Sequence, residues 1–351
     1  MVEGKPISIG NVAYVLGMSS KKLHRWYQNV LSGFTEAVSE GEIGKDDIED
    51  HTLGEVYKIR VPICKDENLG TQMAIDEKTI NGTCYTILSN RQTNKIALMA
   101  ATLKTKHLVS LLAKFDIDKR FNVNSLSRDM ASNYDWFGRQ VFMNAYHVVD
   151  KFHVIKNMLD QLQAIRISYR QEELARRRLA KQTKQPYSNN IMANGETLLQ
   201  LLARSRGFLY TVKSKWSYQQ LKRAQILFEL YPDIKTAYDK VLKIRRWFTP
   251  PKGKRSYQKT IAKKTTQLKQ LCKELKATSI EELKNIAHML KTHSDQIINY
   301  FRSKETNAKA EALNRNLQRF INTNYGARNT DFFLFRVSKH FSLRKYSSTR
   351  L

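Results

Sequence analysis

Hydrophobic and polar positions along the chain change their period at about residue 70 and again at about residue 185. Between these points, short runs rich in β-branched and aromatic residues alternate in polarity, as in half-buried strands. Three such runs, at 71–80, 82–90 and 95–103, are joined by a turn-like Asn81-Gly82 pair and by a polar stretch at 89–95. They predict a β-meander.

The pattern then continues with alternating helix and strand signals. A helix is predicted at 104–115, a fourth strand ends near Asp129, and an alternating stretch at 145–155 leads into a long basic helix through about Lys184. This order predicts an α/β fold, in which helices pack on a mixed sheet. The sequence from 185 to 290 shows the helical period with little strand character and predicts an all-α insertion. Within it, the Lys-rich, Pro-punctuated stretch 250–269 predicts an exposed loop.

The first 34 residues show two short helical patterns separated at Gly17, with Ser19 and Ser20 available to cap the second. Apolar and small positions fit the spacing of a helix-turn-helix; they are Val12, Ala13, Leu16, Met18, Leu23 and Trp26. The second helix would present basic side chains to DNA, namely Lys21, Lys22, His24 and Arg25. An ordinary helical hairpin is the alternative. The acidic, glycine-interrupted region 35–69 is interpreted as a linker.

The net charge of the chain limits the classes of binding partner that are expected. The 351 residues carry a formal net charge of +28, and the excess lies after residue 70, since 1–70 holds 8 basic and 11 acidic residues. A polyanion is therefore expected as partner, with nucleic acid ahead of ribosomal association or an anionic membrane surface. Three widely spaced cysteines exclude a zinc module or a disulfide framework. Without a signal pattern or a membrane-spanning apolar run, we expect a cytoplasmic, nucleoid-associated protein with no membrane partner.

Two carboxylates stand at strand ends, where reactive groups collect in such sheets. Asp76 interrupts the first strand and Asp129 ends the fourth. If the two strands are neighbours, both acids converge on one site. A helix predicted at 306–326 adds a polar face; this face carries Asn307, Glu311, Asn314 and Gln318.

Three blocks resemble, in the same order, the signature blocks of DDE transposases of bacterial insertion sequences. They are "AIDEKTINGTCYTIL", "SRDMASNYD" with "NAYHVVDKFHVIK", and "YFRSKETNAKAEALNRNLQRFINTNYGARNTDFFLFRV". The sequence is most similar to the insertion-sequence-L-three (ISL3) type, from about Gly70 to Lys339. The resemblance implies a ribonuclease-H-like catalytic core in two parts, 70–184 and 291–351, interrupted by the insertion at 185–290.

The resemblance also implies roles for residues. Asp76, Asp129 and Glu311 would form the catalytic triad and bind two Mg²⁺ ions, with Mn²⁺ as a substitute; carboxylates are the hard oxygen ligands that these ions prefer. The enzyme would hydrolyse phosphodiesters at the element ends and join the freed 3′-hydroxyl to target DNA. Other residues match the blocks. Asp150, His153, Asn307 and Asn314 would be accessory, and Arg319 and Arg328 would grip DNA, although Asp150 and His153 equally fit a local strand-end pair.

The resemblance to DDE transposases also implies binding partners. Double-stranded DNA is the expected substrate, and a homodimer or higher oligomer is expected on DNA because two ends must be held together. The family commonly carries an N-terminal zinc module, and the residues before Cys64 include no cysteine to build one. End recognition would then rest on the helix-turn-helix and insertion, or on a separately encoded partner protein. Two alternatives stay open: a structure-selective DNA nuclease on the same core, and a DNA-binding regulator or inactive transposase relative.

Overall fold

The structure is a computed structural model that describes residues 7–41, 45–50, 55–130, 133–187, 191–249, 257–302, 308–323 and 329–342. The chain divides into two compact units. The first combines residues 1–148 with 304–351, and the second is the continuous segment 149–303. The sequence placed the insertion at 185–290, so the second unit also contains the long helix that we had assigned to the catalytic core.

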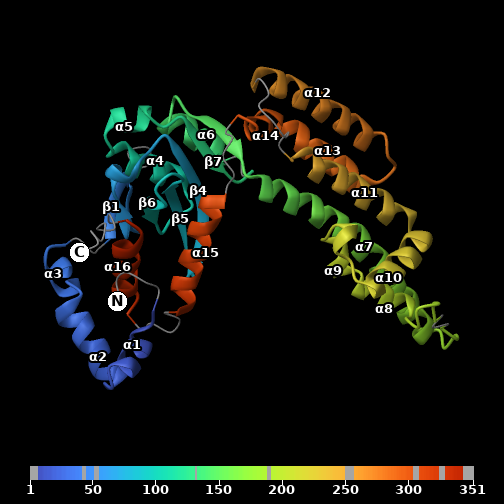
Figure 1. Cartoon of the computed structure of the whole chain (residues 1–351), viewed down its shortest axis with the longest axis horizontal. Coiled ribbons are helices and arrows are strands. Elements are labelled where there is room, and N and C mark those ends of the chain that lie inside the picture. Colours follow the sequence, from blue (N-terminus) through green and yellow to red (C-terminus); the bar gives the residue numbers. More distant parts are fainter. Residues whose placement is uncertain are drawn as a thin grey trace. The chain divides into compact units, whose positions relative to one another are not determined.

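A six-stranded mixed sheet forms the centre of the first unit (Figure 1). Its strands, in spatial order, are β3 (Ile63–Cys64), β6 (Lys95–Ala100), β5 (Thr83–Asn90), β4 (Gln72–Ile80), β7 (Ser125–Arg128) and β8 (Tyr146–Val149). β3, β6, β5 and β4 pair antiparallel, which confirms the predicted meander. β4 and β7 pair in parallel, so the first and fourth predicted strands are indeed neighbours.

Helices cover both faces of this sheet. On one face, α4 (Thr105–Ala113) and α6 (Asn133–Val141) pack their Leu, Phe and Val side chains against Met73, Ile75 and Leu88. On the other face, α15 (Ala308–Thr323) and α16 (Thr330–Phe341) cover Ile80, Tyr85 and Ile87. The alternation of side chains along each strand gives both faces an apolar layer. The result is three layers, helix–sheet–helix, and the mixed sheet with helices packed on it confirms the predicted α/β fold.

Four short helices form the N-terminal region: α1 (Ile9–Val15), α2 (Ser20–Trp26), the π-helix η1 (Tyr27–Leu31) and α3 (Phe34–Ser39). The predicted break is real, because Gly17 has φ +61°, which glycine adopts at little cost. Val12 and Leu23 are buried as expected, but Leu16 is 57% exposed and Trp26 49% exposed. These two predicted core positions are wrong.

The reason is that the helices pack on another part of the same unit. Phe332 of α16 is buried among them, and its ring lies 5.1 Å from that of Phe34 and 5.8 Å from that of Tyr27. The hydrophobic side therefore points toward α16, and it leaves Leu16 and Trp26 in solvent. The structure shows two helices and a turn at 9–26, but it does not by itself show a DNA-reading helix-turn-helix.

The region interpreted as a linker, 35–69, has regular structure instead. It contains most of α3, an antiparallel hairpin of β1 (Lys45–Asp50) and β2 (Glu55–Arg60), strand β3, and the 3-10 turn η2 (Asp66–Asn68). Its acidic composition misled the sequence interpretation. Ile59 of β2 is buried in the core beneath α4, and Arg60 pairs with Asp331 of α16 at 3.2 Å.

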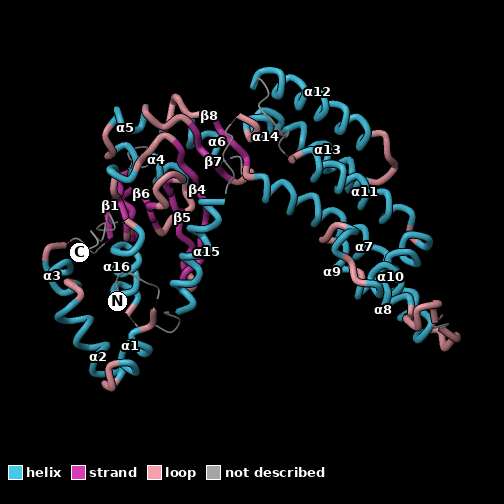
Figure 2. Tube along the Cα trace, viewed as in Figure 1, coloured by secondary structure: helices cyan, strands magenta, loops and turns pink. Residues whose placement is uncertain are grey.

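Between 151 and 302, the described regular elements of the second unit are helices joined by loops (Figure 2), with one isolated β-bridge between Ile191 and Thr197. The long helix α7 (Lys151–Gln182) contacts α8 (Leu198–Arg204), α9 (Arg206–Leu209), α11 (Pro232–Trp247) and α13 (Glu281–Thr292). The unit also contains α10 (Tyr218–Leu230), α12 (Tyr257–Lys276), α14 (Ser294–Asn299) and the 3-10 helix η3 (Lys213–Lys215). The loop predicted at 250–269 is wrong from Tyr257 onward, where α12 begins. Within the described parts of the chain, none of the helices is both long and apolar enough to span a bilayer.

A buried carboxylate ties part of this unit together. Glu196 is 4% exposed and receives hydrogen bonds from Arg223 Nε at 2.9 Å, Arg204 Nη1 at 3.0 Å and Asn194 Nδ2 at 2.9 Å. The hydrogen bond from Arg223 is the main cause that lowers the pKa of Glu196 to about 2. Because Arg204 lies on α8 and Arg223 on α10, this carboxylate links the two helices.

Candidate active site

The parallel pairing of β4 and β7 determines where Asp76 and Asp129 lie. Ala74 is paired with Ser127, and each aspartate lies two residues further along its own strand direction. Neighbouring strands are about 4.8 Å apart. β7 ends at Arg128, so Asp129 is the first residue beyond it. The register therefore brings the two aspartates onto adjacent strands where β7 ends. Asp76 lies within β4, which continues to Ile80, so the predicted interruption of the strand at Asp76 is wrong.

Both aspartates belong to the sheet face that α15 and α16 cover. Asp76 is paired across β4 and β5 with Ile87, and Lys78 with Tyr85. Ile87 and Tyr85 are buried against side chains of α15 and α16. Since paired residues share a face, Asp76 also points to that side. Asp129 follows Ser127 by two residues, and Ser127 pairs with Ala74 on this same face.

Local hydrogen bonds position both carboxylates. Asp76 Oδ1 accepts a hydrogen bond from the Glu77 backbone N–H at 2.8 Å, and Asp129 Oδ1 accepts one from the Met130 backbone N–H at 2.5 Å. Both aspartates are half-buried. Arg128 is 2% exposed, and its Nη1 donates to the Asp129 carbonyl oxygen at 3.0 Å. Each aspartate is thus held by a hydrogen bond from the backbone N–H of the residue that follows it.

The predicted third carboxylate, Glu311, lies in the first turn of α15, the helix that packs on this face. Asn314 is one turn further along. The structure describes their backbone but not their side chains, and Asn307 and Arg328 lie outside the described residues. Among the side chains that are described, no three His, Cys, Asp or Glu residues converge as metal ligands. Asp76 and Asp129 supply oxygen donors of the type that Mg²⁺ binds, so the described part of the site fits such an ion.

Asp150 and His153 are at the start of the second unit. Asp150 caps α7, because its Oδ1 accepts a hydrogen bond from the Phe152 backbone N–H at 2.9 Å. His153 Nδ1 lies 3.7 Å from Asp150 Oδ2. This is the local pair that the sequence offered as the alternative to an accessory catalytic role, and helix capping accounts for the carboxylate.

The predicted DNA-binding side chains that the structure describes lie on two helices, α2 and α15. Lys21, Lys22 and Arg25 are exposed along α2, as expected. His24 is also exposed, but its ring makes an edge contact with Phe332 at 5.9 Å, and burial followed by the nearby Arg336 lowers its pKa. Arg319 is exposed on α15.

The comparisons with known proteins decide the family. A family model described as a transposase, of the DDE ISL3 type, matches residues 73–337. The chain belongs to the ISL3 family of DDE transposases. The six-stranded mixed sheet flanked by helices fits the ribonuclease-H-like core of such a transposase, and membership implies that the protein binds DNA. No curated protein and no solved structure matches this sequence.

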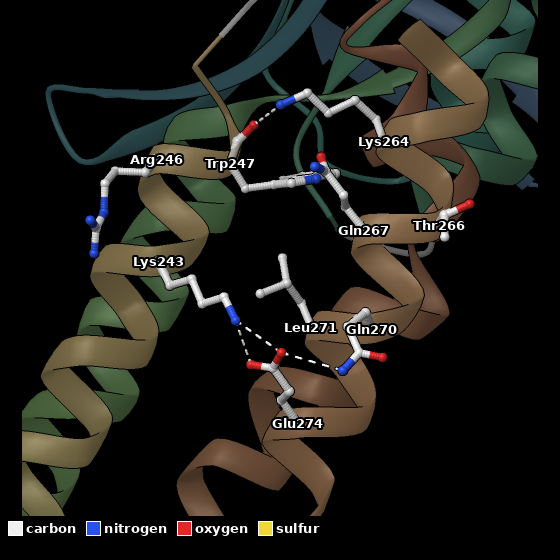
Figure 3. A pocket seen from close by; sticks show the side chains of 9 residues that line it. All are labelled: Lys243, Arg246, Trp247, Lys264, Thr266, Gln267, Gln270, Leu271 and Glu274. Carbon is white, nitrogen blue, oxygen red and sulfur yellow. Dashed lines mark hydrogen bonds and ion pairs between the residues drawn. The ribbon is translucent and has the colours of Figure 1, made fainter. Parts of the chain in front are cut away.

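The sequence analysis missed two features of the transposase, the buried Arg128 and a cavity in the second unit (Figure 3). Arg128 was not singled out, although a buried arginine directly before a strand-end aspartate is unusual, since arginine is rarely fully buried. It also missed a cavity between α11 and α12, because α12 was interpreted as a loop. The buried Leu268, Leu271 and Leu275 show the helical spacing that could have revealed that helix.

Proposed function

We propose that the transposase cuts phosphodiesters at the ends of its element with Asp76, Asp129 and Glu311 as metal-binding catalytic residues, and then joins the freed 3′-hydroxyl to target DNA. The single observation that carries the proposal is the parallel pairing of β4 and β7, which brings two aspartates abreast on the face that α15 covers. Glu311 belongs to that helix.

The proposed division of labour follows from the chemistry of carboxylates. Asp76 and Asp129, fixed by backbone N–H groups, would hold one side of the metal site, and Glu311 would close it from α15. Two divalent ions, Mg²⁺ or Mn²⁺, would supply Lewis acidity to the attacking and leaving oxygens of an in-line displacement. Lys78, two residues from Asp76 on the same strand, is placed to neutralise a flanking phosphate.

The second unit supports a DNA partner through its charge. Residues 149–303 contain 32 Lys and Arg against 12 Asp and Glu, so this unit carries +20 of the chain's +28. At the end of α7, Arg177, Arg178 and Lys181 are all exposed. We propose that the unit binds the phosphate backbone of element or target DNA. Because two ends must be joined in one event, the active form would contain at least two copies.

The test is cleavage and joining of a labelled DNA that carries the terminal repeats. Asp76→Asn, Asp129→Asn and Glu311→Gln are each expected to lower cleavage by at least about 100-fold, because losing a metal ligand costs more than losing an outer partner. Duplex binding should persist. Glu77→Gln is the matched control, since Glu77 points to the opposite side of β4 from Asp76, and it should cleave normally.

Three results would contradict the proposal or favour an alternative. A Glu311→Gln protein that still cleaves would remove Glu311 from the site. Cleavage without any joined product would favour a structure-selective nuclease, and metal-independent binding without cleavage would favour a regulator.

A further inference from the structure

Arg128 is the last residue of β7, and its side chain is only 2% exposed. Arginine is rarely buried to this extent, because removing a guanidinium group from water is costly. Leu126, two residues earlier, packs in the apolar core beneath α4 and α6, so the Arg128 side chain leaves the strand on that same face. An apolar side chain of similar volume would fill such a place at lower cost. The charge is therefore not needed for packing.

The guanidinium group is bonded to the backbone at the strand end. Its Nη1 donates a hydrogen bond to the carbonyl oxygen of Asp129 at 3.0 Å. The next backbone N–H, that of Met130, donates a hydrogen bond to Asp129 Oδ1 at 2.5 Å. This carbonyl and this N–H belong to one planar peptide group. Arg128 thus holds the oxygen side of the same peptide group whose N–H side holds the carboxylate.

The other aspartate, Asp76, is positioned differently. It lies within β4, whose pairing with β5 continues to the end of the strand, so the sheet itself fixes the backbone there. The pairing of β4 with β7 has its last pair at Ala74 and Ser127, and Asp129 lies beyond that pair. The hydrogen bond from Arg128 therefore acts at the point where pairing with β4 has ended.

Burial also decides what Arg128 does not do. A side chain that is 2% exposed does not reach a DNA phosphate, and it leaves β7 on the sheet face opposite to that of Asp129. Two roles are compatible with this place: a direct effect of the positive charge on the nearby acids, and the positioning of the peptide group. The hydrogen bond to the Asp129 carbonyl oxygen favours the second role.

We propose that Arg128 is a positioning residue of the metal site. Its hydrogen bond fixes the peptide group between Asp129 and Met130, and the N–H of that peptide group fixes the Asp129 carboxylate in the orientation that a divalent ion binds. Loss of a residue that orients a metal ligand commonly weakens metal binding by about 10–100-fold. The inference rests on the proposed function, because it takes Asp129 as a metal ligand.

The test is the binding of Mn²⁺ to the full-length protein, alone and in complex with duplex DNA, followed by electron paramagnetic resonance of the free ion. Mn²⁺ binds the same oxygen ligands as Mg²⁺. Arg128→Met keeps a long side chain but removes the donor and the charge, and it should weaken Mn²⁺ binding by about 10–100-fold. The affinity is the decisive quantity, because a partly unfolded sample binds fewer ions without changing the affinity of the folded molecules.

A second variant acts on the other side of the same peptide group. Met130→Pro removes the N–H that donates to Asp129 but leaves the charge of Arg128 in place. It should weaken Mn²⁺ binding to a similar degree, whereas Met130→Ala keeps the N–H and should bind Mn²⁺ more tightly than Met130→Pro. Met130→Pro thus separates positioning through the peptide group from a direct effect of the charge. It also decides the question if Arg128→Met does not fold.

Arg166→Met is the matched control for the loss of a buried arginine. Arg166 is 5% exposed, and its Nη1 donates a hydrogen bond to the Leu202 carbonyl oxygen at 2.8 Å in the second unit, which contains neither aspartate. This variant should leave the affinity for Mn²⁺ unchanged. As a parallel measurement, the Mg²⁺ concentration for half-maximal DNA cleavage should rise by about 10–100-fold in Arg128→Met and stay the same in Arg166→Met.

The outcomes separate this inference from the proposed function. Wild-type affinity for Mn²⁺ in Arg128→Met, or in Met130→Pro, would overturn the positioning role. Wild-type protein that binds no Mn²⁺ with or without DNA, or Asp129→Asn that binds it as tightly as the wild type, would refute the proposed metal site and this inference with it. If Asp129→Asn loses affinity while Arg128→Met does not, only the role of Arg128 fails.

Discussion

Replacing Glu196 by glutamine should lower the free energy of unfolding of the second unit by about 3 kcal/mol. The carboxylate receives charged hydrogen bonds from Arg204 and Arg223, and its pKa falls from 4.5 to about 2. Each unit of pKa is worth about 1.4 kcal/mol, so ionised Glu196 favours the folded state by about 3 kcal/mol. Breaking a buried ion pair costs a similar amount, about 3–5 kcal/mol. Glutamine keeps the shape and loses the charge.

The same carboxylate gives a defined pH dependence. Its pKa in the folded state lies below the value of 4.5 in the unfolded state, so the unfolded chain binds the proton more readily. The stabilisation is therefore complete above about pH 4.5 and is lost as the pH falls toward about 2. Glu196→Gln should flatten the unfolding free energy across that interval.

Hydrogen exchange of peptides from α8 and α10, with urea unfolding in parallel, measures the change within the unit that contains Glu196. Glu281→Gln is the control, because its carboxylate pairs with Lys284 but the side chain is 72% exposed, and such a pair contributes less than about 1 kcal/mol. If Glu196→Gln destabilised the protein no more than Glu281→Gln, the argument from the buried network would be refuted.

Three other expectations follow from the structure. Arg177→Ala with Arg178→Ala should make the slope of log affinity against log salt for duplex DNA shallower by about 2; an unchanged slope would mean that the end of α7 does not touch phosphates. Phe332→Ala should lower the free energy of unfolding by about 3–5 kcal/mol and release the N-terminal helices to protease; unaltered proteolysis would contradict their packing on α16. Gly138→Ala should destabilise α6 by about 1–3 kcal/mol in thermal unfolding, because a Cβ there would lie 2.6 Å from the His147 ring, whereas Gly207→Ala, with open space, should be neutral.

The strands could be predicted because their signals are local. Each strand of the meander alternates in polarity, and Asn81 and Gly82 adopt the positive φ angles, 48° and 80°, of a tight hairpin turn. The chain order allowed β4 and β7 to be neighbours but did not require it, and their parallel pairing is seen in the structure. Asp76 and Asp129 were singled out from their positions in the strand pattern, and their catalytic role stays a prediction.

Other features depend on distant parts of the chain and could not be read locally. The burial of Leu23 and the exposure of Leu16 depend on Phe332, which lies some three hundred positions away in the sequence. Composition was also given more weight than the helical period. The lysines and prolines of 250–269 suggested a loop, although α12 begins at Tyr257 and buries Leu268 and Leu271 on one side. The acidic run before residue 50 hid the hairpin of β1 and β2 in the same way.

The first unit is formed from two separate segments of the chain, and this affects how the protein folds during translation. Its sheet is translated before residue 149, but α15 and α16, which cover one sheet face and anchor the N-terminal helices, are translated after residue 303. The second unit is continuous and can fold as soon as it has emerged. A nascent chain therefore exposes one apolar face of the sheet until synthesis is nearly complete. A chain that terminates before α15 lacks Glu311, and it also lacks the α16 side chains on which α1 to α3 pack.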